Sequence, residues 1–196
     1  MLYSVILACT LDGGIGYNNN LPWDIKNELK IFKRVTESTR GYKENAIIMG
    51  RKTFFSLNEK PLKNRINIVI STTYELKHDF SNLLIFSTID MALNYCEYSH
   101  ERINKVFVIG GKSIYDLCLN NSKYYNKIEK IYLSIIYKKY LCDTFIDIKK
   151  ILKDFKPMIT NSVFDPEFLH IVMKNKNKYL PSQSNPLYHP DNVDIY

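Results

Sequence analysis

The stretch VFVIGGKSIYDLCLN, residues 106–120, decides the fold class of this chain. Four consecutive apolar residues are followed at once by two glycines and then by apolar residues at helical spacing. A short run that is apolar at every position is typical of a strand buried on both faces of a sheet. The order of strand, glycine pair and helix therefore predicts one unit of an α/β protein with a mostly parallel sheet.

Similar strand-then-helix units recur on both sides of this stretch. Short β-branched and aromatic runs predict strands at Tyr3–Ala8, Ala46–Met49, Ile66–Ile70, Leu83–Phe86, Lys105–Ile109, Lys130–Ile135 and Phe168–Met173. Helical patterns alternate with them at Ile25–Thr36, Arg51–Leu57, Thr88–Tyr98 and Lys112–Asn120. We expect Asp24 to cap the first helix. The last strands follow each other without a helix, so we expect an antiparallel hairpin with Asp165–Glu167 near its turn.

Length and periodicity predict one globular domain followed by a tail. The chain has 196 residues, which is enough to bury a sizeable core. We expect the domain to cover residues 1–175. After about Asn175 the periodicity is lost, and prolines and polar residues dominate. Residues 176–196 are therefore expected to form an irregular tail, or a linker to a domain absent from this chain.

Composition argues against several classes of partner. The net charge is +7, but arginine numbers only five, and the 22 lysines are spread over every expected surface instead of forming one stripe. We therefore expect no nucleic-acid partner. No apolar run approaches the roughly 20 residues of a membrane span. The apolar start lacks a basic n-region, which argues against a signal peptide. The four scattered cysteines then predict free thiols and a cytoplasmic location: Cys9, Cys96, Cys118 and Cys142.

The glycine pair Gly110–Gly111 is a candidate phosphate site. A P-loop would need glycine where Val106 stands, so that motif is excluded. The stretch DGGIG at 12–16 lacks the third glycine of a dinucleotide fingerprint. A glycine pair still lets the backbone approach a ligand closely, and the helix that follows offers unpaired N–H groups to a phosphate. The alternative is a pair of glycines that serves packing alone.

The stretch MGRKT at 49–53 repeats this arrangement. Its glycine follows a buried strand, and the next turn carries Arg51, Lys52 and Thr53. Cations at a helix N-terminus oppose the helix dipole, and a bound phosphate would resolve that conflict. The alternative is a solvated first turn. The hydroxyls of STT at 71–73 also follow a strand. Together these sites predict an elongated, dinucleotide-like ligand that carries an extra phosphate.

The stretch LPWDIKNELKIFK, residues 21–33, places a carboxylate on an apolar helix face. Ile25, Leu29 and Phe32 share a face at helical spacing, and Glu28 falls on the same face. Glu28 could simply reach solvent or pair with a lysine. If it is buried, it can accept two hydrogen bonds from an amidine-like edge, and burial would raise its pKa. Phe32 could line the site of an aromatic ligand or belong to the core, and Trp23 could be a lid residue or belong to the core.

Taken together, these stretches resemble the dihydrofolate reductases, and the eukaryotic type more closely than the bacterial. The resemblance covers residues 3 to about 173. Its motifs, in the family's order, are ILA at 6–8, DGGIGYNNNLPW at 12–23, Glu28 with Phe32, IIMGRKTF at 47–54, PLKNRINIVIS at 61–71, VFVIGGKSIY at 106–115 and CDTF at 142–145. The resemblance implies an eight-stranded, mostly parallel sheet with an antiparallel C-terminal hairpin and four flanking helices. It also implies NADPH-dependent reduction of 7,8-dihydrofolate to tetrahydrofolate, a step of one-carbon metabolism and nucleotide biosynthesis.

The resemblance also implies a substrate site. Glu28 would hold the N3 and 2-amino edge of the pterin, and Ser134 would bond that carboxylate where the family usually has Thr. Arg65 would pair with the glutamate α-carboxylate, a bidentate task suited to arginine. The implied catalytic group is Glu28, Leu21, Trp23 and Ser134. The implied substrate-binding residues are Ile6, Ala8, Glu28, Phe32, Leu57, Leu62, Arg65, Ile109, Tyr115 and Ser134.

For the cofactor, the resemblance implies NADPH and no metal. Residues 16–20 would belong to a loop that closes over the nicotinamide, and Gly110–Gly111 would be a cis peptide. Thr72 stands where the family often has a basic residue beside the 2′-phosphate. The implied cofactor-binding residues are Ala8, Ile15, Gly16, Asn18, Asn19, Asn20, Gly50, Arg51, Lys52, Thr53, Ser71, Thr72, Thr73, Gly110, Gly111, Lys112, Ser113, Ile114 and Tyr115.

In the implied mechanism, a hydride passes from NADPH to pterin C6, and a water admitted by the 16–23 loop protonates N5. Antifolates would compete for the site. Two rival functions are weighed: a riboflavin-pathway reductase of the same fold, which Glu28 and Arg65 disfavour, and a basic nucleotide- or RNA-binding module without catalysis. A thymidylate synthase domain fused beyond the tail is a further expectation left open by the sequence.

Overall fold

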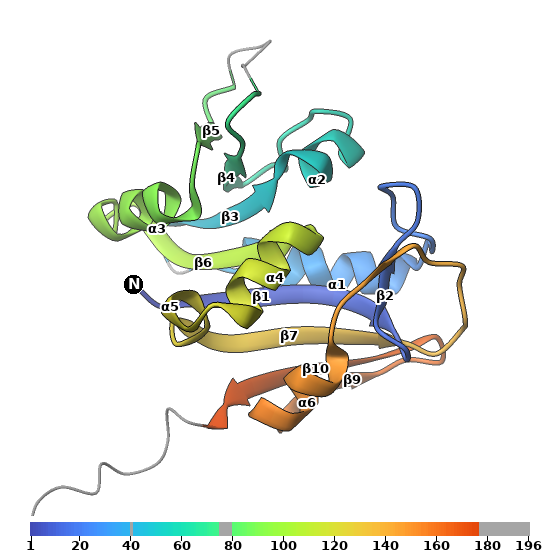
Figure 1. The fold of residues 1–196 in the computed structure, drawn as a ribbon. Helices are drawn as coiled ribbons and strands as arrows, with labels where there is room; N and C mark the ends of the chain where they lie inside the picture. Colours follow the sequence, from blue (N-terminus) through green and yellow to red (C-terminus); the bar gives the residue numbers. More distant parts are fainter. Residues whose placement is uncertain (40, 75–79, 177–196) are drawn as a thin grey trace, which may run out of the picture.

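The fold is built on one eight-stranded sheet, which Figure 1 shows face-on. The computed structural model describes residues 1–39, 41–74 and 80–176 of the chain. The strand order is β5-β4-β3-β6-β1-β7-β10-β9. Neighbours from β5 to β7 are parallel, whereas β7, β10 and β9 pair antiparallel. The strands are β1 (Tyr3–Thr10), β3 (Glu44–Gly50), β4 (Arg65–Ile70), β5 (Leu83–Phe86), β6 (Ile103–Gly110), β7 (Ile128–Ile136), β9 (Phe155–Phe164) and β10 (Phe168–Asn175). The predicted α/β class and C-terminal hairpin are confirmed.

Helices cover both faces of the sheet. They are α1 (Lys26–Glu37), α2 (Arg51–Ser56), α3 (Ile89–Tyr98), α4 (Lys112–Asn120), α5 (Ser122–Tyr125) and α6 (Ile148–Asp154). Helix α1 lies behind the sheet in Figure 1, and α3, α4, α5 and α6 lie in front of it. The central strands β3 and β6 are largely buried between these layers, which explains their continuous apolar runs, whereas β9 at the sheet edge is mostly exposed.

Successive strand side chains point to opposite faces, so a hydrophobic core forms on each face of the sheet. A third, smaller cluster includes Trp23, Ile31 and Phe168. Val5 and Leu7 of β1 belong to the core under α3, α4 and α6, whereas Ile6 belongs to the core under α1 and α2. Residues of β3 alternate in the same way, with Ile48 in the first core and Ile47 in the second. Central strands therefore fix the positions of helices on both sides.

The structure has six helices in its described residues, where four were expected. The additional helices are short, and each begins with a side chain that caps it. Asn121 accepts a hydrogen bond from the Lys123 N–H at α5, and Asp147 accepts one from the Lys150 N–H at α6. Helices of one or two turns produce too little periodicity to be found from a pattern.

The expected cap of the first helix is wrong. Helix α1 begins at Lys26, so its N-cap position falls on Ile25, and no side chain caps it. Asp24 lies one residue further out and is exposed. The carboxylate in the first turn is Glu28.

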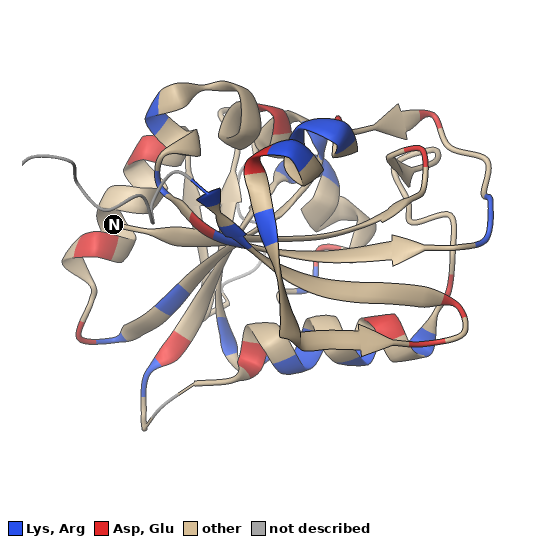
Figure 2. Ribbon diagram, turned by 90° about the horizontal axis from the view of Figure 1, so that it is seen from below, with Lys and Arg blue, Asp and Glu red and all other residues tan. Residues whose placement is uncertain are grey.

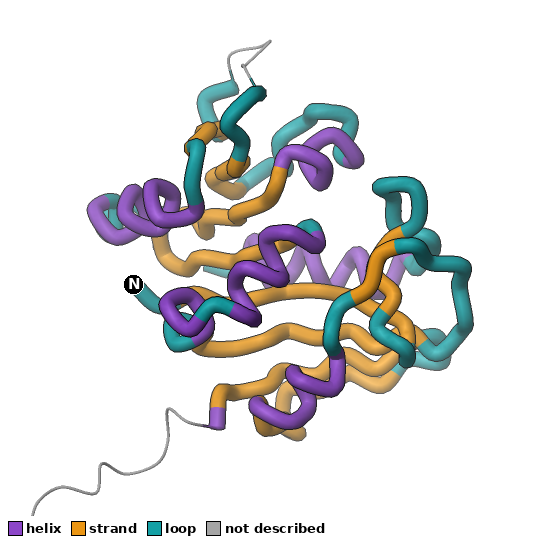
Figure 3. The backbone as a smooth tube through the Cα atoms, viewed as in Figure 1, coloured by secondary structure: helices purple, strands orange, loops and turns teal. Residues whose placement is uncertain are grey.

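A second, small sheet joins two loops at one end of the molecule. It pairs β2 (Gly14–Gly16) with β8 (Thr144–Phe145), and neither strand was predicted. Figure 3 shows the two loops side by side. The Asn18 N–H donates to Asp143 Oδ2 at 2.8 Å, and the Asp143 N–H donates to the Gly16 carbonyl at 3.0 Å. The loop after β1 is thereby tied to the connection between β7 and β8.

Charged side chains are distributed over the whole fold. Lysine and arginine lie on several helices and strands and are interspersed with acidic residues (Figure 2).

The four cysteines are free, as expected: Cys9, Cys96 and Cys118 are buried, and Cys142 is partly exposed. In the described part of the chain, no helix has the length and apolar character needed to cross a membrane. The predicted tail lies outside the described residues except for Lys176.

Candidate active site

A cleft of about 960 Å³ opens where β3, β4 and β6 reach their carboxyl ends. The helix that follows β3 packs on one face of the sheet, and the helix that follows β6 packs on the other. Adjacent parallel strands whose helices leave to opposite faces create a crevice at their ends, where α/β proteins bind ligands. Helix α1 and the loop around Gly16 complete the walls.

Most of the residues that the sequence singled out surround this one cleft. All of the expected catalytic, substrate-binding and cofactor-binding residues line it except Asn18, Trp23, Gly110 and Ser134. The substrate and cofactor groups were inferred from separate motifs, yet the fold brings them to the same cavity. Within the described residues, no three side chains of His, Cys, Asp or Glu are placed to hold a metal ion.

Glu28 is the carboxylate at the inner wall of the cleft. It lies in the first turn of α1 and is only 6% exposed. Burial raises the pKa of this carboxyl group, and the Ser134 hydroxyl, which hydrogen-bonds to it, offsets part of that rise. Phe32, one helical turn later, faces the same space. The alternative that Glu28 reaches solvent is therefore wrong.

Ser134 and Trp23 lie behind the wall of the cleft instead of on its surface. Ser134 is on β7, is buried, and its Oγ lies 3.0 Å from Nδ1 of His170 on β10. Trp23 is buried and packs edge-on against Tyr140 with ring centroids 5.7 Å apart. Its indole N–H has no hydrogen-bond acceptor among the described residues. Of the implied catalytic group, only Leu21 and Glu28 face the cavity directly.

Tyr115 connects the two sides of the cleft. It lies in α4 and is buried, and its hydroxyl donates to the Ile6 carbonyl of β1 at 2.8 Å. Burial raises the pKa of the phenol, so it remains protonated at neutral pH. The apolar part of the cavity around it is formed by side chains from β1, α1, β6 and the end of α2, among them Ile6, Phe32, Ile109 and Leu57, which follows α2.

Arg65 forms a cationic site in the wall of the cleft, and its side chain is 5% exposed. Its Nη1 donates to Thr36 Oγ1 at 2.8 Å, and its Nε donates to the Lys63 carbonyl at 2.9 Å. Its Nη2 lies 3.1 Å from Oε1 of Glu37. Burial lowers the pKa of this guanidinium, and Glu37 opposes that change. The sequence predicted the arginine but gave no sign of its partner.

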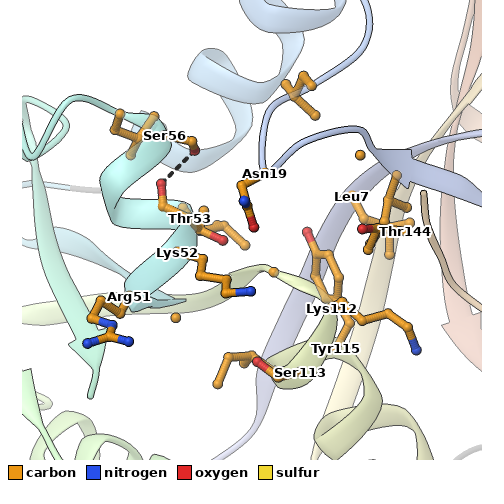
Figure 4. A pocket seen from close by; sticks show the side chains of 18 of the residues that line it. Leu7, Asn19, Arg51, Lys52, Thr53, Ser56, Lys112, Ser113, Tyr115 and Thr144 are labelled. Carbon is orange, nitrogen blue, oxygen red and sulfur yellow. Dashed lines mark hydrogen bonds between the residues drawn. The ribbon is translucent and has the colours of Figure 1, made fainter. Parts of the chain in front are cut away.

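The glycine turns form the other part of the cleft, and Figure 4 shows it closely. Side chains of α2, including Lys52 and Thr53, face Lys112, Ser113 and Tyr115 of α4 across the cavity (Figure 4). Arg51 Nη1 donates to Thr73 Oγ1 at 2.6 Å, which brings a cation next to the 71–73 hydroxyls. Lys112 pairs with Asp116 on the next helical turn. Arg51 and Lys52 border the cleft but are exposed, so the phosphate site at this turn stays a prediction beside the alternative of a solvated first turn.

Gly110 requires glycine for two reasons. Its φ is +108°, and a Cβ added there would lie 2.9 Å from the Tyr115 ring. The peptide between Gly110 and Gly111 is cis, as the resemblance implied. A Cβ on Gly111 would lie 3.0 Å from Thr53 Oγ1, so this backbone approaches α2 closely. Both glycines therefore serve packing, and Gly111 also borders the cleft.

Several residues that line the cleft were not expected. Leu29 and Lys33 on α1 lie beside Glu28 and Phe32. Leu29 was placed on the apolar helix face but not named as a site residue, and extending that face by one position would have found Lys33. Thr144 enters the cleft through the pairing of β8 with β2, for which the local sequence carries no signal. The remaining unexpected residues are Leu7, Ser56, Ile70 and Asp116.

Comparison with known proteins identifies relatives over most of the chain. The profile of the dihydrofolate reductase family matches residues 2–163. The bifunctional dihydrofolate reductase-thymidylate synthase of Paramecium tetraurelia is 34% identical over 181 residues, which are 90% of this chain and 36% of that protein. The dihydrofolate reductase of Drosophila melanogaster is 34% identical over 146 residues, covering 73% of this chain and 78% of that protein. That of Pneumocystis carinii is 38% identical over 158 residues, or 74% of each chain. The chain thus spans about a third of the bifunctional relative's length.

Proposed function

This chain belongs to the dihydrofolate reductase family, and on that premise we propose that it reduces 7,8-dihydrofolate to 5,6,7,8-tetrahydrofolate with NADPH as the reductant. The observation that carries the proposal is the position of Glu28. This carboxylate is nearly buried and borders a cleft whose opposite part is formed by glycine turns, hydroxyls and cations. A protein that only binds nucleotides has no need for a desolvated carboxylate beside an apolar wall.

Glu28 is suited to hold the pterin ring. Its two oxygens can accept hydrogen bonds from N3 and the 2-amino group, an arrangement in which charge and planar geometry both favour binding. Phe32 and Ile109 border the same cavity and can pack on the faces of an aromatic ring. The buried hydroxyl of Ser134 supports the carboxylate from behind.

The residues at the glycine turns fit a phosphorylated dinucleotide. The cations of Arg51, Lys52 and Lys112 and the hydroxyl of Thr53 border one cavity. Because Gly111 leaves no room for a side chain against Thr53, its backbone can lie close to a ligand there. We assign the 2′-phosphate to Arg51 and the 71–73 hydroxyls, since Arg51 contacts Thr73 and supplies the charge that Thr72 lacks. NADPH, when bound, supplies the hydride.

For the chemical step, the residues of this chain place the substrate and control water. Glu28 fixes the pterin so that C6 faces the nicotinamide part of the cleft. Leu21 and the loop at 16–20 border the cavity and limit access of solvent. We infer that a water admitted past this loop protonates N5, because Glu28 binds the opposite edge of the ring.

Two further proposals concern the domain organisation and the cellular location of the protein. We propose that the domain is joined to thymidylate synthase, as the name of the Paramecium tetraurelia relative suggests. The mass of the native protein on an immunoblot tests this. We also propose that the protein is cytoplasmic, since its four cysteines are free thiols.

The experiment that tests the activity follows NADPH absorbance in the presence of dihydrofolate and the purified chain. We expect one NADPH oxidised for each dihydrofolate, and inhibition by methotrexate. A folded protein that binds NADPH but oxidises none with dihydrofolate would contradict the proposal.

A further inference from the structure

Arg65 and Glu37 form an ion pair inside the wall of the cleft. Arg65 is the first residue of β4, and Glu37 is the last residue of α1. The Nη2···Oε1 distance is 3.1 Å, and the two side chains are 5% and 19% exposed. A guanidinium this far removed from water needs a nearby anion, because leaving it uncompensated is strongly unfavourable. In the free protein, Glu37 is that anion.

The position of Arg65 does not depend on Glu37. The Nη1 and Nε atoms donate to Thr36 Oγ1 and to the Lys63 carbonyl. Thr36 is itself fixed, since its Oγ1 donates to the Phe32 carbonyl at 2.8 Å and its own carbonyl accepts from Asn45. The guanidinium is therefore held by two hydrogen bonds to the protein, and its Nη2 is left for an acidic group.

Glu37 contacts Arg65 by charge more than by hydrogen bonding. Its Oε1 is buried, yet among the described residues it accepts no hydrogen bond of acceptable geometry. A bidentate guanidinium–carboxylate pair has two aligned N–H···O bonds and is correspondingly stronger. A ligand carboxylate that approached Arg65 in that geometry would form the better pair.

We propose that Glu37 is a specificity-determining residue: its carboxylate occupies Arg65 in the free protein and must yield the guanidinium to the carboxylate at the tail of the substrate. This inference rests on the proposed function, which assigns Arg65 to that tail. Two carboxylates beside one guanidinium repel each other, so Glu37 weakens binding of any ligand with an anionic tail. A pterin without a tail does not meet Glu37, and its affinity is independent of this residue.

The test compares two ligands by calorimetry at neutral pH. One is dihydrofolate, and the other is a 6-alkyl-7,8-dihydropterin, which lacks the aminobenzoyl-glutamate tail. In Glu37→Gln, which keeps the shape and removes the charge, we expect the Kd for dihydrofolate to fall about three- to ten-fold. The Kd for the tailless pterin stays unchanged. The matched control is Glu44→Gln, because Glu44 pairs with Arg102 at the surface at 3.6 Å and its loss changes the net charge equally. Neither Kd changes in this control.

Two outcomes would overturn the inference: an unchanged or higher Kd for dihydrofolate in Glu37→Gln, or an equal fall for both ligands. If that variant does not fold, Glu37→Asp keeps the charge but moves it away from Arg65. Its Kd for dihydrofolate should also fall, by a smaller factor, and an unchanged or higher value would overturn the inference. Because binding is measured without turnover, the expected Kd pattern in a protein that lacks reductase activity would contradict the proposed function alone. Failure of both ligands to bind the unaltered protein would contradict both.

Discussion

Ser134 and His170 face each other across two neighbouring strands, with Oγ and Nδ1 3.0 Å apart. They are register partners of β7 and β10, and both are buried. Burial lowers the pKa of His170 to about 4, and the charge of Arg34 adds to this effect. The imidazole is therefore neutral at physiological pH, and it shares the Ser134 hydroxyl with Glu28 on α1.

We expect His170 to make the protein sensitive to acid. The unfolded chain takes up a proton on this residue near pH 6.5, whereas the folded chain resists until about pH 4. Stability is thus lost as pH falls through this range, by roughly 3 kcal/mol for the full difference. In His170→Phe this part of the loss disappears, which urea unfolding between pH 7 and pH 4 measures. His100→Phe, at an exposed histidine, should keep the original pH dependence. If the free energy of unfolding changed with pH equally in both variants, His170 would not be the cause of the acid sensitivity.

Glu28→Gln is expected to fold normally and to lose most of its turnover at neutral pH. Burial raises the pKa of Glu28, so the ionised carboxylate destabilises the folded state above that pKa, and the amide relieves this. The thermal midpoint at pH 7 should therefore be equal or higher. The value of kcat should fall by about 100-fold or more, as measured by NADPH absorbance. Unchanged turnover would remove Glu28 from the mechanism.

Gly110→Ala should damage both stability and cofactor binding. The new Cβ would meet the Tyr115 ring at 2.9 Å, and the backbone φ of +108° is unsuited to alanine. We expect a loss of about 3 kcal/mol in the free energy of unfolding, because the steric clash with the Tyr115 ring adds to the backbone strain of alanine at positive φ. Gly41→Ala is the control, since Gly41 has a φ of +66° but open space around it. It should lose only about 1 kcal/mol. Equal losses would show that the contact with Tyr115 does not matter.

Arg51→Gln should weaken binding of NADPH more than binding of NADH. The guanidinium contacts Thr73 and lies over the Phe55 ring, 5.7 Å from its centroid, so it is positioned beside the 71–73 hydroxyls. Loss of a charged contact to a phosphate should raise the Kd for NADPH about ten-fold or more and leave that for NADH nearly unchanged. Fluorescence titration with the two cofactors measures this. Lys105→Gln, at an exposed lysine outside the cleft, should affect neither cofactor.

The sequence predicts the long, buried elements of this fold well and its short elements poorly. The central strands and the long helices were found because burial on both faces of a sheet produces continuous apolar runs, as in residues 106–109. Helices α5 and α6 and strands β2 and β8 were missed, because elements this short leave no periodic signal. Asp24 was wrongly predicted as the cap because α1 begins at Lys26, one residue later than expected.

In the candidate site, the residues marked by local patterns were predicted, but their tertiary partners were not. Glu28 and Phe32 were predicted because helical spacing is a local property, and the glycine turns because they follow buried strands. The partners of these residues were not predicted. His170 meets Ser134 only through the register of two strands, and Glu37 meets Arg65 only where α1 ends against β4. Such contacts depend on tertiary packing, which a single sequence does not contain in readable form.

The central position of β1 has a consequence for synthesis on the ribosome. This strand is made before both of its neighbours, β6 and β7, which begin at Ile103 and Ile128. Until those segments emerge, the apolar residues of β1 have no partner strand on either side, and a nascent chain in this state is vulnerable to aggregation. Folding of the sheet must therefore await most of the domain. Slower translation of the segment between β1 and β7 would prolong this exposed stage, whereas slower translation after β7 would not.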